Sequence, residues 1–443
     1  MLSNNTRRDF LKATAAAGVG FWAAAGAEAK ESVSANEEIN FAAIGIGGKG
    51  SSDSRSAAQN GNLVAICDID DKRLNDAGNR YPDAKKYNDY RVMLDEMDKD
   101  IDAVTVSIPD HSHAPASAMA MKLGKHCFTQ KPLTHSIYEA RRLGEIAREN
   151  KVVTQMGNQG TAGSGLRRAA EIIQAGDIGT VSAVHVWTNR PVWPQGIPVP
   201  PEKPVPKHLH WDLFLGPAKE RAYGEGYHPF EWRGWWDFGT GALGDMACHT
   251  LNMPYMGLKL RDPTSVDSTT AGHDGQTYPK WSVINFEFPE YEGRAALKMV
   301  WYDGGKLPSA ELTDQVTEGG KKKLSNSGCL LIGDKGMIYS PNDYGEKYNL
   351  LPADKFADYK SPKETIPRSP GHFKEFADAI KGGPEPMSNF PNYAGPLSEV
   401  ILLGNLSVFA GKKIEWDAKN LVATNAPEVA EIVRPKYREG YSL

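Results

Sequence analysis

The chain has 443 residues, of which 40% are hydrophobic and 24% are charged, and its formal net charge is −4. This balance is that of a soluble globular protein, and the length predicts two or three domains of about 150 residues each. The lack of a basic surplus argues against binding to nucleic acid or to an anionic membrane. The cysteines are too scattered for a disulfide framework, and we expect buried free thiols at Cys67, Cys127, Cys248 and Cys329.

The first 29 residues have the layout of a bacterial export signal. Arg7 and Arg8 precede an apolar run rich in Ala and Gly at residues 13–27, and small residues near its end offer a cleavage site. The run is too short to span a bilayer stably, which takes about 20 apolar residues. The paired arginines resemble the twin-arginine class of signals, which exports folded proteins. We therefore expect residues 1–29 to be removed and the mature protein to be periplasmic or otherwise exported, with no membrane segment.

A glycine-rich turn follows the first predicted strand, at residues 41–46. Gly45, Gly47 and Gly50 fit the spacing G-x-G-x-x-G between a strand and a helix. In this pattern the glycines permit a tight turn, let a pyrophosphate approach the backbone, and let the helix pack on the strand. The first turn of the helix also offers free N–H groups to phosphates. The segment, with Gly48 included, is therefore a candidate dinucleotide site.

An acid ends the second predicted strand, at residues 63–67. Asp68 lies 18 residues beyond Gly50, where a carboxylate can bind the 2′-hydroxyl of a ribose and repel a 2′-phosphate. We therefore expect NAD as the cofactor, with NADP less favoured. The simpler interpretation of Asp68 is a turn residue at a strand end, and the glycines before it favour the ribose role.

Strands and helices continue to alternate up to residue 157. An amphipathic helix is predicted at 136–151, between further strands at 103–109, 125–132 and 152–158. This alternation is typical of the α/β class, with a Rossmann-type doubly wound parallel sheet whose ligand lies at the carboxyl edge of the strands. We assign residues 38–157 to this dinucleotide-binding domain.

The motifs GIGGKG, CDID and IPDHSHAPASAMAMKLGKHCFTQKPL together resemble the Gfo/Idh/MocA family of oxidoreductases, which includes glucose–fructose oxidoreductase and inositol dehydrogenase. The resemblance implies a Glu-Lys-Pro turn after the fifth strand, with its lysine near the nicotinamide and the reacting hydroxyl. Lys131 takes that position, but Gln130 replaces the glutamate. Gln130 keeps the shape and most hydrogen bonds of a glutamate and lacks its charge. We assign six further residues to the cofactor site, in addition to the glycines and Asp68. They are Pro109, His113, Gln130, Lys131, Pro132 and Asn158.

The segment after residue 187 is rich in proline and tryptophan. Seven prolines lie within residues 191–206, which predicts an extended surface loop. Six of the ten tryptophans lie between residues 187 and 236, and flat aromatic faces stack well on sugar rings. About half of them would be explained by a core alone. We assign to substrate binding the three in irregular segments, Trp193, Trp235 and Trp236.

Asp245 and His249 lie four residues apart in a predicted helix that follows a run of glycines. This spacing places both side chains on one helix face. A histidine can accept the proton of a secondary alcohol near neutral pH. The resemblance implies that Asp245 orients the substrate and His249 acts as general base, while Lys131 supports the alkoxide. An incidental surface pair and a partial metal site with His208 and His210 are the alternatives, but no third ligand has suitable spacing, so we expect no metal.

Further strands and two closing helices agree with the C-terminal α/β domain of the family, built on an open, mostly antiparallel sheet. We assign residues 158–443 to this domain, for substrate binding and for assembly into a homo-dimer or homo-tetramer.

Three functions remain open from the sequence. The leading hypothesis is an exported NAD-dependent dehydrogenase that oxidises a secondary hydroxyl of a sugar, glycoside or cyclitol and keeps its cofactor tightly bound. The second is an NAD-dependent glycosidase or epimerase with a redox-neutral cycle of oxidation, elimination and reduction. The third is a binding protein for a sugar or NAD that has lost catalysis.

Overall fold

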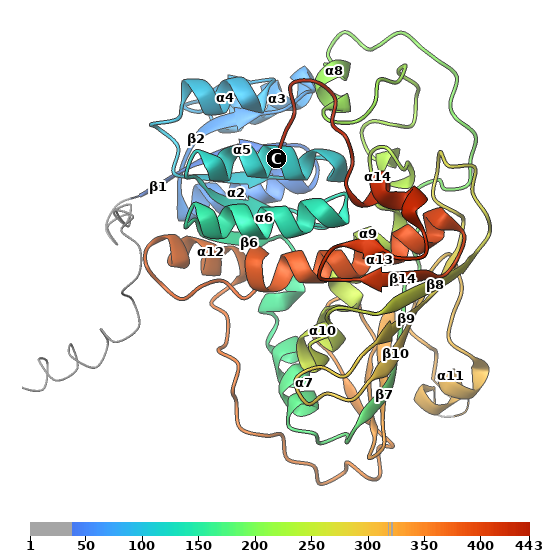
Figure 1. The fold of residues 1–443 in the computed structure, drawn as a ribbon. Coiled ribbons are helices and arrows are strands. Elements are labelled where there is room, and N and C mark those ends of the chain that lie inside the picture. Colours follow the sequence, from blue (N-terminus) through green and yellow to red (C-terminus); the bar gives the residue numbers. More distant parts are fainter. Residues whose placement is uncertain (1–37, 318, 320–321) are drawn as a thin grey trace, which may run out of the picture.

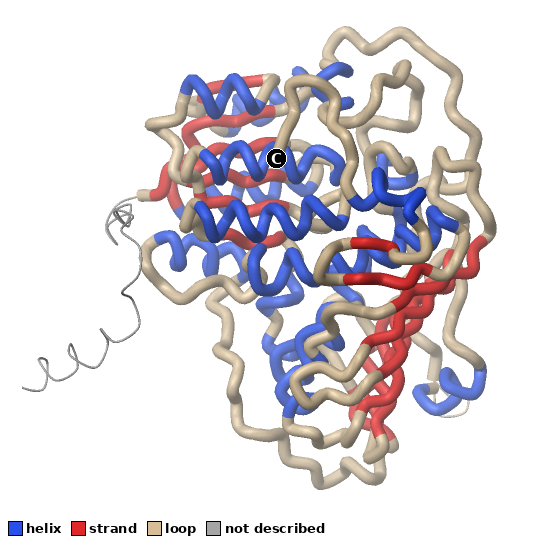
Figure 2. The backbone as a smooth tube through the Cα atoms, in the orientation of Figure 1, coloured by secondary structure: helices blue, strands red, loops and turns tan. Residues whose placement is uncertain are grey.

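The computed structural model of the protein describes residues 38–317, 319 and 322–443. The predicted export signal at residues 1–29, including Arg7 and Arg8, lies outside these residues. The described chain forms two sheets, which Figure 2 shows as two separate groups of strands.

The first sheet has six parallel strands in the order β3-β2-β1-β4-β5-β6. The order reverses between β1 and β4, and a crevice forms at the carboxyl ends of the strands at such a point. This confirms the predicted doubly wound sheet. Its strands are β1 (Ile39–Ile44), β2 (Gly61–Cys67), β3 (Lys85–Tyr87), β4 (Ala103–Val106), β5 (His126–Thr129) and β6 (Thr154–Met156).

Helices cover both faces of this sheet. Apolar side chains of α2 (Lys49–Asn60) and α3 (Asp71–Arg80) pack on one face, and those of α4 (Tyr90–Glu96), α5 (Asp110–Lys122) and α6 (Ile137–Glu149) pack on the other. The face that carries α2 is completed by α12 (His372–Ile380), whose Phe376 and Ile380 pack against Phe41 of β1. The C-terminal half of the chain therefore contributes to the first domain (Figure 1).

The second sheet has nine strands in the order β13-β12-β11-β7-β10-β9-β8-β14-β15. Among the described strands, β7 and β10 form its one parallel pair, so the sheet is mixed and mostly antiparallel, as predicted. Its strands are β7 (Val181–Trp187), β8 (Ser265–Thr270), β9 (Ser282–Phe288), β10 (Leu297–Tyr302), β11 (Gly328–Gly333), β12 (Met337–Ser340), β13 (Asn349–Leu351), β14 (Ile414–Asp417) and β15 (Val422–Ala423).

One face of the second sheet packs on helices, which are α7 (Ser164–Gln174), α9 (Gly241–Thr250), α10 (Asn252–Leu258) and α13 (Gly395–Ala410). In the part of the chain that the structure describes, one helical stretch, Phe390–Ala410, is long and apolar enough to cross a membrane. Of its most apolar window, 78% is buried inside the protein. The stretch is therefore a core helix that packs between the two domains.

Residues 188–240, here called the cap, leave β7 and return over the first domain (Figure 1). The cap contains α8 (Trp211–Leu215) and η2 (Glu231–Gly234), and its own core consists largely of aromatic side chains. Leu209 pairs with Asp70 just beyond β2, and the backbone N–H of His210 donates to the carbonyl of Ile69. These backbone bonds hold the cap against the carboxyl edge of the first sheet.

Residues 434–443, here called the tail, lie between the cap and the first domain. Arg438 donates through Nε to the carbonyl of Gly216 and forms an ion pair with Asp212 of α8. Arg91 of α4 donates to the carbonyl of Gly440 at 3.3 Å. The tail therefore ties the cap to the first domain.

Candidate active site

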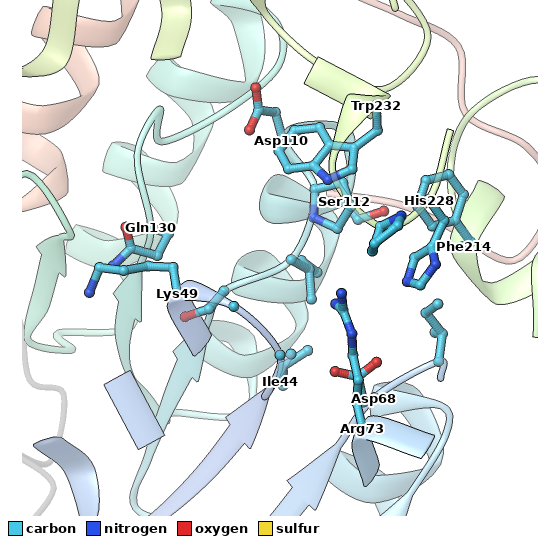
Figure 3. A pocket seen from close by; sticks show the side chains of 18 of the residues that line it. Ile44, Lys49, Asp68, Arg73, Asp110, Ser112, Gln130, Phe214, His228 and Trp232 are labelled. Carbon is cyan, nitrogen blue, oxygen red and sulfur yellow. The ribbon is translucent and has the colours of Figure 1, made fainter. Parts of the chain in front are cut away.

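A cavity of about 360 Å³ lies between the carboxyl ends of the first sheet and the cap (Figure 3). Its floor comes from the glycine turn, the end of β2 and the ends of β4 and β5. Its roof comes from the cap, through Leu213, Phe214, His228, Pro229, Phe230, Trp232 and Arg233. The cavity therefore lies at the predicted ligand edge, and residues far away in sequence form its roof.

The glycine turn is shaped by close backbone contacts. Gly45 has a φ of +80°, and a Cβ added there would lie 2.4 Å from the carbonyl oxygen of Ser107. A Cβ added to Gly50 would lie 2.1 Å from the carbonyl oxygen of Gly45. Only glycine fits both places. Gly47 and Gly48 also line the cavity, so the turn presents bare backbone and the N-terminus of α2 to a ligand, which suits a pyrophosphate.

The carboxylate of Asp68 lies at the same cavity. Its Oδ2 accepts from the N–H of Ile46 and its Oδ1 from the N–H of Asp70, each at 3.0 Å. Burial raises the pKa of Asp68, and these backbone donors oppose that effect. The carboxylate is thus fixed beside the turn, where it can accept hydrogen bonds from a ribose. The Arg73 side chain lies over Gly47 and lines the cavity beside Asp68 (Figure 3).

The fit of a dinucleotide rests on these features together. A glycine turn that a Cβ would block, a helix N-terminus and a fixed carboxylate lie along one cavity. Asn158 does not line the cavity; its Oδ1 accepts from Ser388, and its buried Nδ2 has no hydrogen-bond partner among the described residues. The residues present therefore suit NAD.

Lys131 meets Asp245 across the junction between the two domains. Lys131 follows β5, and its Nζ donates to the Oδ1 of Asp245 at 2.7 Å and to the Asp245 carbonyl at 2.8 Å. Arg233 of the cap donates to the same Oδ1 at 3.2 Å. Burial by itself would raise the pKa of Asp245, but the two cations hold it at about 2. Asp245 is therefore ionised, and two cations share its charge at the cavity wall formed by Lys131 and Arg233.

His249 lies one turn beyond Asp245 on α9, as the spacing predicts. It is 4% exposed, and its ring packs against Tyr344 with 4.9 Å between the ring centroids. Its Nδ1 has no hydrogen-bond partner among the described residues. Burial lowers the pKa of His249 to about 3, with the Lys131 charge adding to the effect. The imidazole is thus neutral, with its Nδ1 free of protein partners among the described residues. Neither it nor Asp245 lines the cavity, whose wall here is formed by Lys131 and Arg233.

A second carboxylate joins the two domains at this point. Asp110, the first residue of α5, is 3% exposed and accepts from the hydroxyl of Thr240 at 2.6 Å. Burial raises the pKa of Asp110 to about 6. Thr240 precedes α9, so this bond fixes the helix that carries Asp245 and His249. Asp110 is not among the predicted site residues, although an acid directly after Pro109, three residues beyond β4, was a visible signal.

Of the remaining predicted cofactor residues, some line the cavity and others do not. Pro109 and Gln130 line the cavity beside Lys131. His113 does not, because its buried ring lies between the carbonyls of Pro132 at 2.8 Å and Ile108 at 2.7 Å. Its position indicates that it joins the loops after β4 and β5, which carry Pro109 and Lys131.

The predicted tryptophans require correction. Trp235 is 1% exposed inside the cap and Trp193 is 5% exposed, so neither offers a face to a ligand. Trp236 stacks on Tyr278 and lines a different cavity. The aromatic side chains that the cap contributes to the cavity are instead Phe214, Phe230 and Trp232. The tryptophan-rich segment mainly forms the core of the cap.

Within residues 38–317, 319 and 322–443, no three His, Cys, Asp or Glu side chains gather in a way that could hold a metal ion. His208 and His210 instead pair with Asp70 and Asp71, at 3.0 Å each.

Two family profiles match the chain and together cover a little over half of it. The first, an oxidoreductase family with an NAD-binding Rossmann fold, matches residues 39–158, and the second, its C-terminal alpha/beta domain, matches residues 176–295. The chain belongs to the Gfo/Idh/MocA family. Its first domain is therefore an NAD-binding Rossmann domain, as predicted.

Inositol 2-dehydrogenase of Salmonella typhimurium is 32% identical over 147 residues, and levoglucosan dehydrogenase of Pseudarthrobacter phenanthrenivorans is 24% identical over 178 residues. These matches cover 32% and 40% of the present chain, and 43% and 38% of the respective relatives. The chain thus matches less than half the length of either relative.

Among solved structures, the WlbA dehydrogenase from Bordetella pertussis, in complex with NADH and UDP-GlcNAcA, superposes with a TM-score of 0.60 at 16% identity, over 86% of this chain and 99% of that one. The aldose-aldose oxidoreductase from Caulobacter crescentus has a TM-score of 0.55 at 16% identity, over 86% of this chain and 100% of that one. At this identity the likeness shows the shared two-domain fold of the family.

Proposed function

We propose that the protein is an exported NAD-dependent oxidoreductase that oxidises a secondary hydroxyl of a sugar, glycoside or cyclitol. The observation that carries the proposal is the pairing of Lys131 with Asp245 at the wall of the cavity that begins at the glycine turn. This pairing joins the end of the NAD-binding sheet to a helix of the second domain. Relatives named as inositol and levoglucosan dehydrogenases favour the same substrate class.

The binding site follows from the residues described above. Gly45, Gly47, Gly48 and the start of α2 would hold the pyrophosphate, and Asp68 the adenosine ribose. When bound, NAD supplies an acceptor for the hydride of the alcohol carbon. Asp68 also disfavours a 2′-phosphate, so NAD is the expected form.

Lys131 provides the positive charge next to the reacting hydroxyl. Asp245 keeps the ammonium group oriented through two hydrogen bonds. An ammonium held in this way stabilises the negative charge that develops on the hydroxyl oxygen as its proton leaves. We assign the acceptance of that proton to the neutral imidazole of His249, on the same helix face as Asp245. Because His249 does not line the cavity, the assignment requires the substrate to reach its unpartnered Nδ1.

The position of the cap favours retention of the bound cofactor. It roofs the cavity with aromatic side chains and is held by the tail and by backbone bonds to residues after β2. A cofactor retained in this way must return its hydride within the same site, to a second carbonyl substrate or to the oxidised sugar itself. The second route is the redox-neutral cycle of a glycosidase or epimerase, which we retain as the second candidate.

The test starts with protein purified and washed without added nucleotide. We expect bound dinucleotide by absorbance, and turnover of at least one member of a panel of sugars, cyclitols and glycosides. Reduction of the cofactor without release of an aglycone supports the dehydrogenase, and release without net reduction supports the redox-neutral cycle.

Lys131→Met is expected to lower kcat by about 100-fold or more. Lys125→Met is the matched control, because Lys125 is a buried lysine of the same domain that pairs with Asp98 away from the cavity. Full turnover by Lys131→Met would refute the proposed role of Lys131. Export is tested by replacing Arg7 and Arg8 with lysine, which should leave the protein in the cytoplasmic fraction.

A further inference from the structure

A buried carboxylate of α2 lies next to the turn that carries Lys131. Asp53 is 3% exposed. Its Oδ2 accepts from the side-chain amide of Gln130 at 2.8 Å and from the hydroxyl of Ser107 at 2.8 Å. Its Oδ1 pairs with the Nζ of Lys49, at the start of the same helix. Asp53 therefore connects the glycine-turn helix to the ends of β4 and β5.

The residue at position 130 must donate to this carboxylate. Gln130 can do so through its amide N–H, whereas an ionised glutamate has no donor and would place a second negative charge at the same distance. The Gln130 amide lies against the backbone of Gly157, because a Cβ added to Gly157 would lie 2.3 Å from its Nε2. The residue types at positions 53 and 130 are therefore coupled.

We propose that Asp53 is a positioning residue that supplies, from α2, the carboxylate that the turn before Lys131 lacks. Asp53 holds Gln130, and the backbone that follows Gln130 directs Lys131 towards Asp245. The inference rests on the proposed role of Lys131 in the reaction, and it explains how the chain keeps that turn ordered with glutamine in place of glutamate.

The test exchanges the two side chains. Gln130→Glu places two carboxylates against each other, and we expect kcat to fall roughly 10- to 100-fold, the range that follows from a small displacement of a reacting group. The double variant Asp53→Asn, Gln130→Glu moves the negative charge from position 53 to position 130. The new carboxylate can then accept a hydrogen bond from the side-chain amide at position 53. We expect it to recover at least about tenfold of the lost kcat. Asp53→Asn alone should be milder, because the asparagine oxygen still accepts from Gln130.

A second measurement needs no substrate. The rate at which an amine-reactive reagent labels Lys131, followed by peptide mass spectrometry, reports the position of its ammonium group. In the parent protein Lys131 is paired and 16% exposed, so labelling is slow. We expect it to be several-fold faster in Gln130→Glu and slow again in the double variant. If no sugar is turned over, the proposed function fails, and the labelling series still decides the role of Asp53.

Gln195→Glu is the matched control. Gln195 is 6% exposed and Gln130 is 5% exposed, and Gln195 lies in the cap, bonded to Trp193. Asp53→Asn should not rescue any defect of Gln195→Glu. If Gln130→Glu does not fold, a double variant that folds and in which Lys131 is labelled as slowly as in the parent protein supports the proposal. A double variant no better than Gln130→Glu, or one that regains thermal stability but neither kcat nor slow labelling of Lys131, overturns it.

Discussion

Asp245→Asn removes the carboxylate that Lys131 and Arg233 share, and the structure sets the size of the effect. The two cations lower the Asp245 pKa from its ordinary value of 3.8 to about 2, in spite of burial. At about 1.4 kcal/mol for each pH unit, this corresponds to roughly 2–3 kcal/mol in favour of the folded state. The partners are only 16% and 23% exposed, so the variant also leaves two poorly solvated charges. We expect it to lose about 2–3 kcal/mol at pH 7.

The effect has a defined dependence on pH. Because the folded-state pKa lies below the unfolded value, ionised Asp245 stabilises the fold above about pH 4, and this contribution is lost as the pH falls towards 2. Roughly half of the difference between the parent and Asp245→Asn should be gone at pH 3.

Urea unfolding followed by tryptophan fluorescence at pH 7 and pH 3 measures both values. Asp212→Asn is the control, because Asp212 is 77% exposed in its pair with Arg438 and should change stability by less than about 0.5 kcal/mol. An Asp245→Asn variant that is as stable as the parent at pH 7, or equally destabilised at both pH values, would refute the reasoning.

Three further predictions concern the reaction and the cofactor. His249→Gln should lower kcat by about 100-fold or more with an unchanged dissociation constant for NAD. Because burial holds the His249 pKa at about 3, the parent should show no acid limb from this group in kcat/KM between pH 8 and pH 4, and a limb near pH 6.5 that His249→Gln abolishes would contradict this. Asp68→Asn should reduce the preference for NAD over NADP, measured as the ratio of their dissociation constants. An unchanged ratio would mean that Asp68 does not contact the ribose. Gly50→Ala should abolish NAD binding, since its Cβ would lie 2.1 Å from the Gly45 oxygen; an unchanged dissociation constant for NAD would contradict the assigned role of the glycine turn.

The first domain could be predicted from the sequence because its signals are local. A strand, three spaced glycines, a helix and an acid at the next strand end lie within 30 residues, and each step follows from short-range backbone geometry. The four-residue spacing of Asp245 and His249 also gave their common helix face correctly. Lys131 and Asp245 are in contact although they are 114 positions apart in the chain. Neither the residue types nor their spacing shows that such distant residues meet. The expectation that they face each other came from the family resemblance.

The cap could not be predicted in the same way. Trp235 and Phe230 are both aromatic residues of one irregular segment, yet Trp235 is 1% exposed and Phe230 is 46% exposed. Which of them faces a ligand depends on how the segment folds over the first domain, and the residue types do not show this. Asp53 was missed for a related reason, because its partner Gln130 follows a strand 77 positions later.

The contacts that hold the cap depend on residues that are synthesised last. Arg91 and Gly440, which meet where the tail crosses the first domain, are 349 positions apart. During translation the dinucleotide turn emerges from the ribosome long before the tail does. The glycine turn therefore exists on the growing chain before Arg438 can make its contacts with Gly216 and Asp212 of the cap.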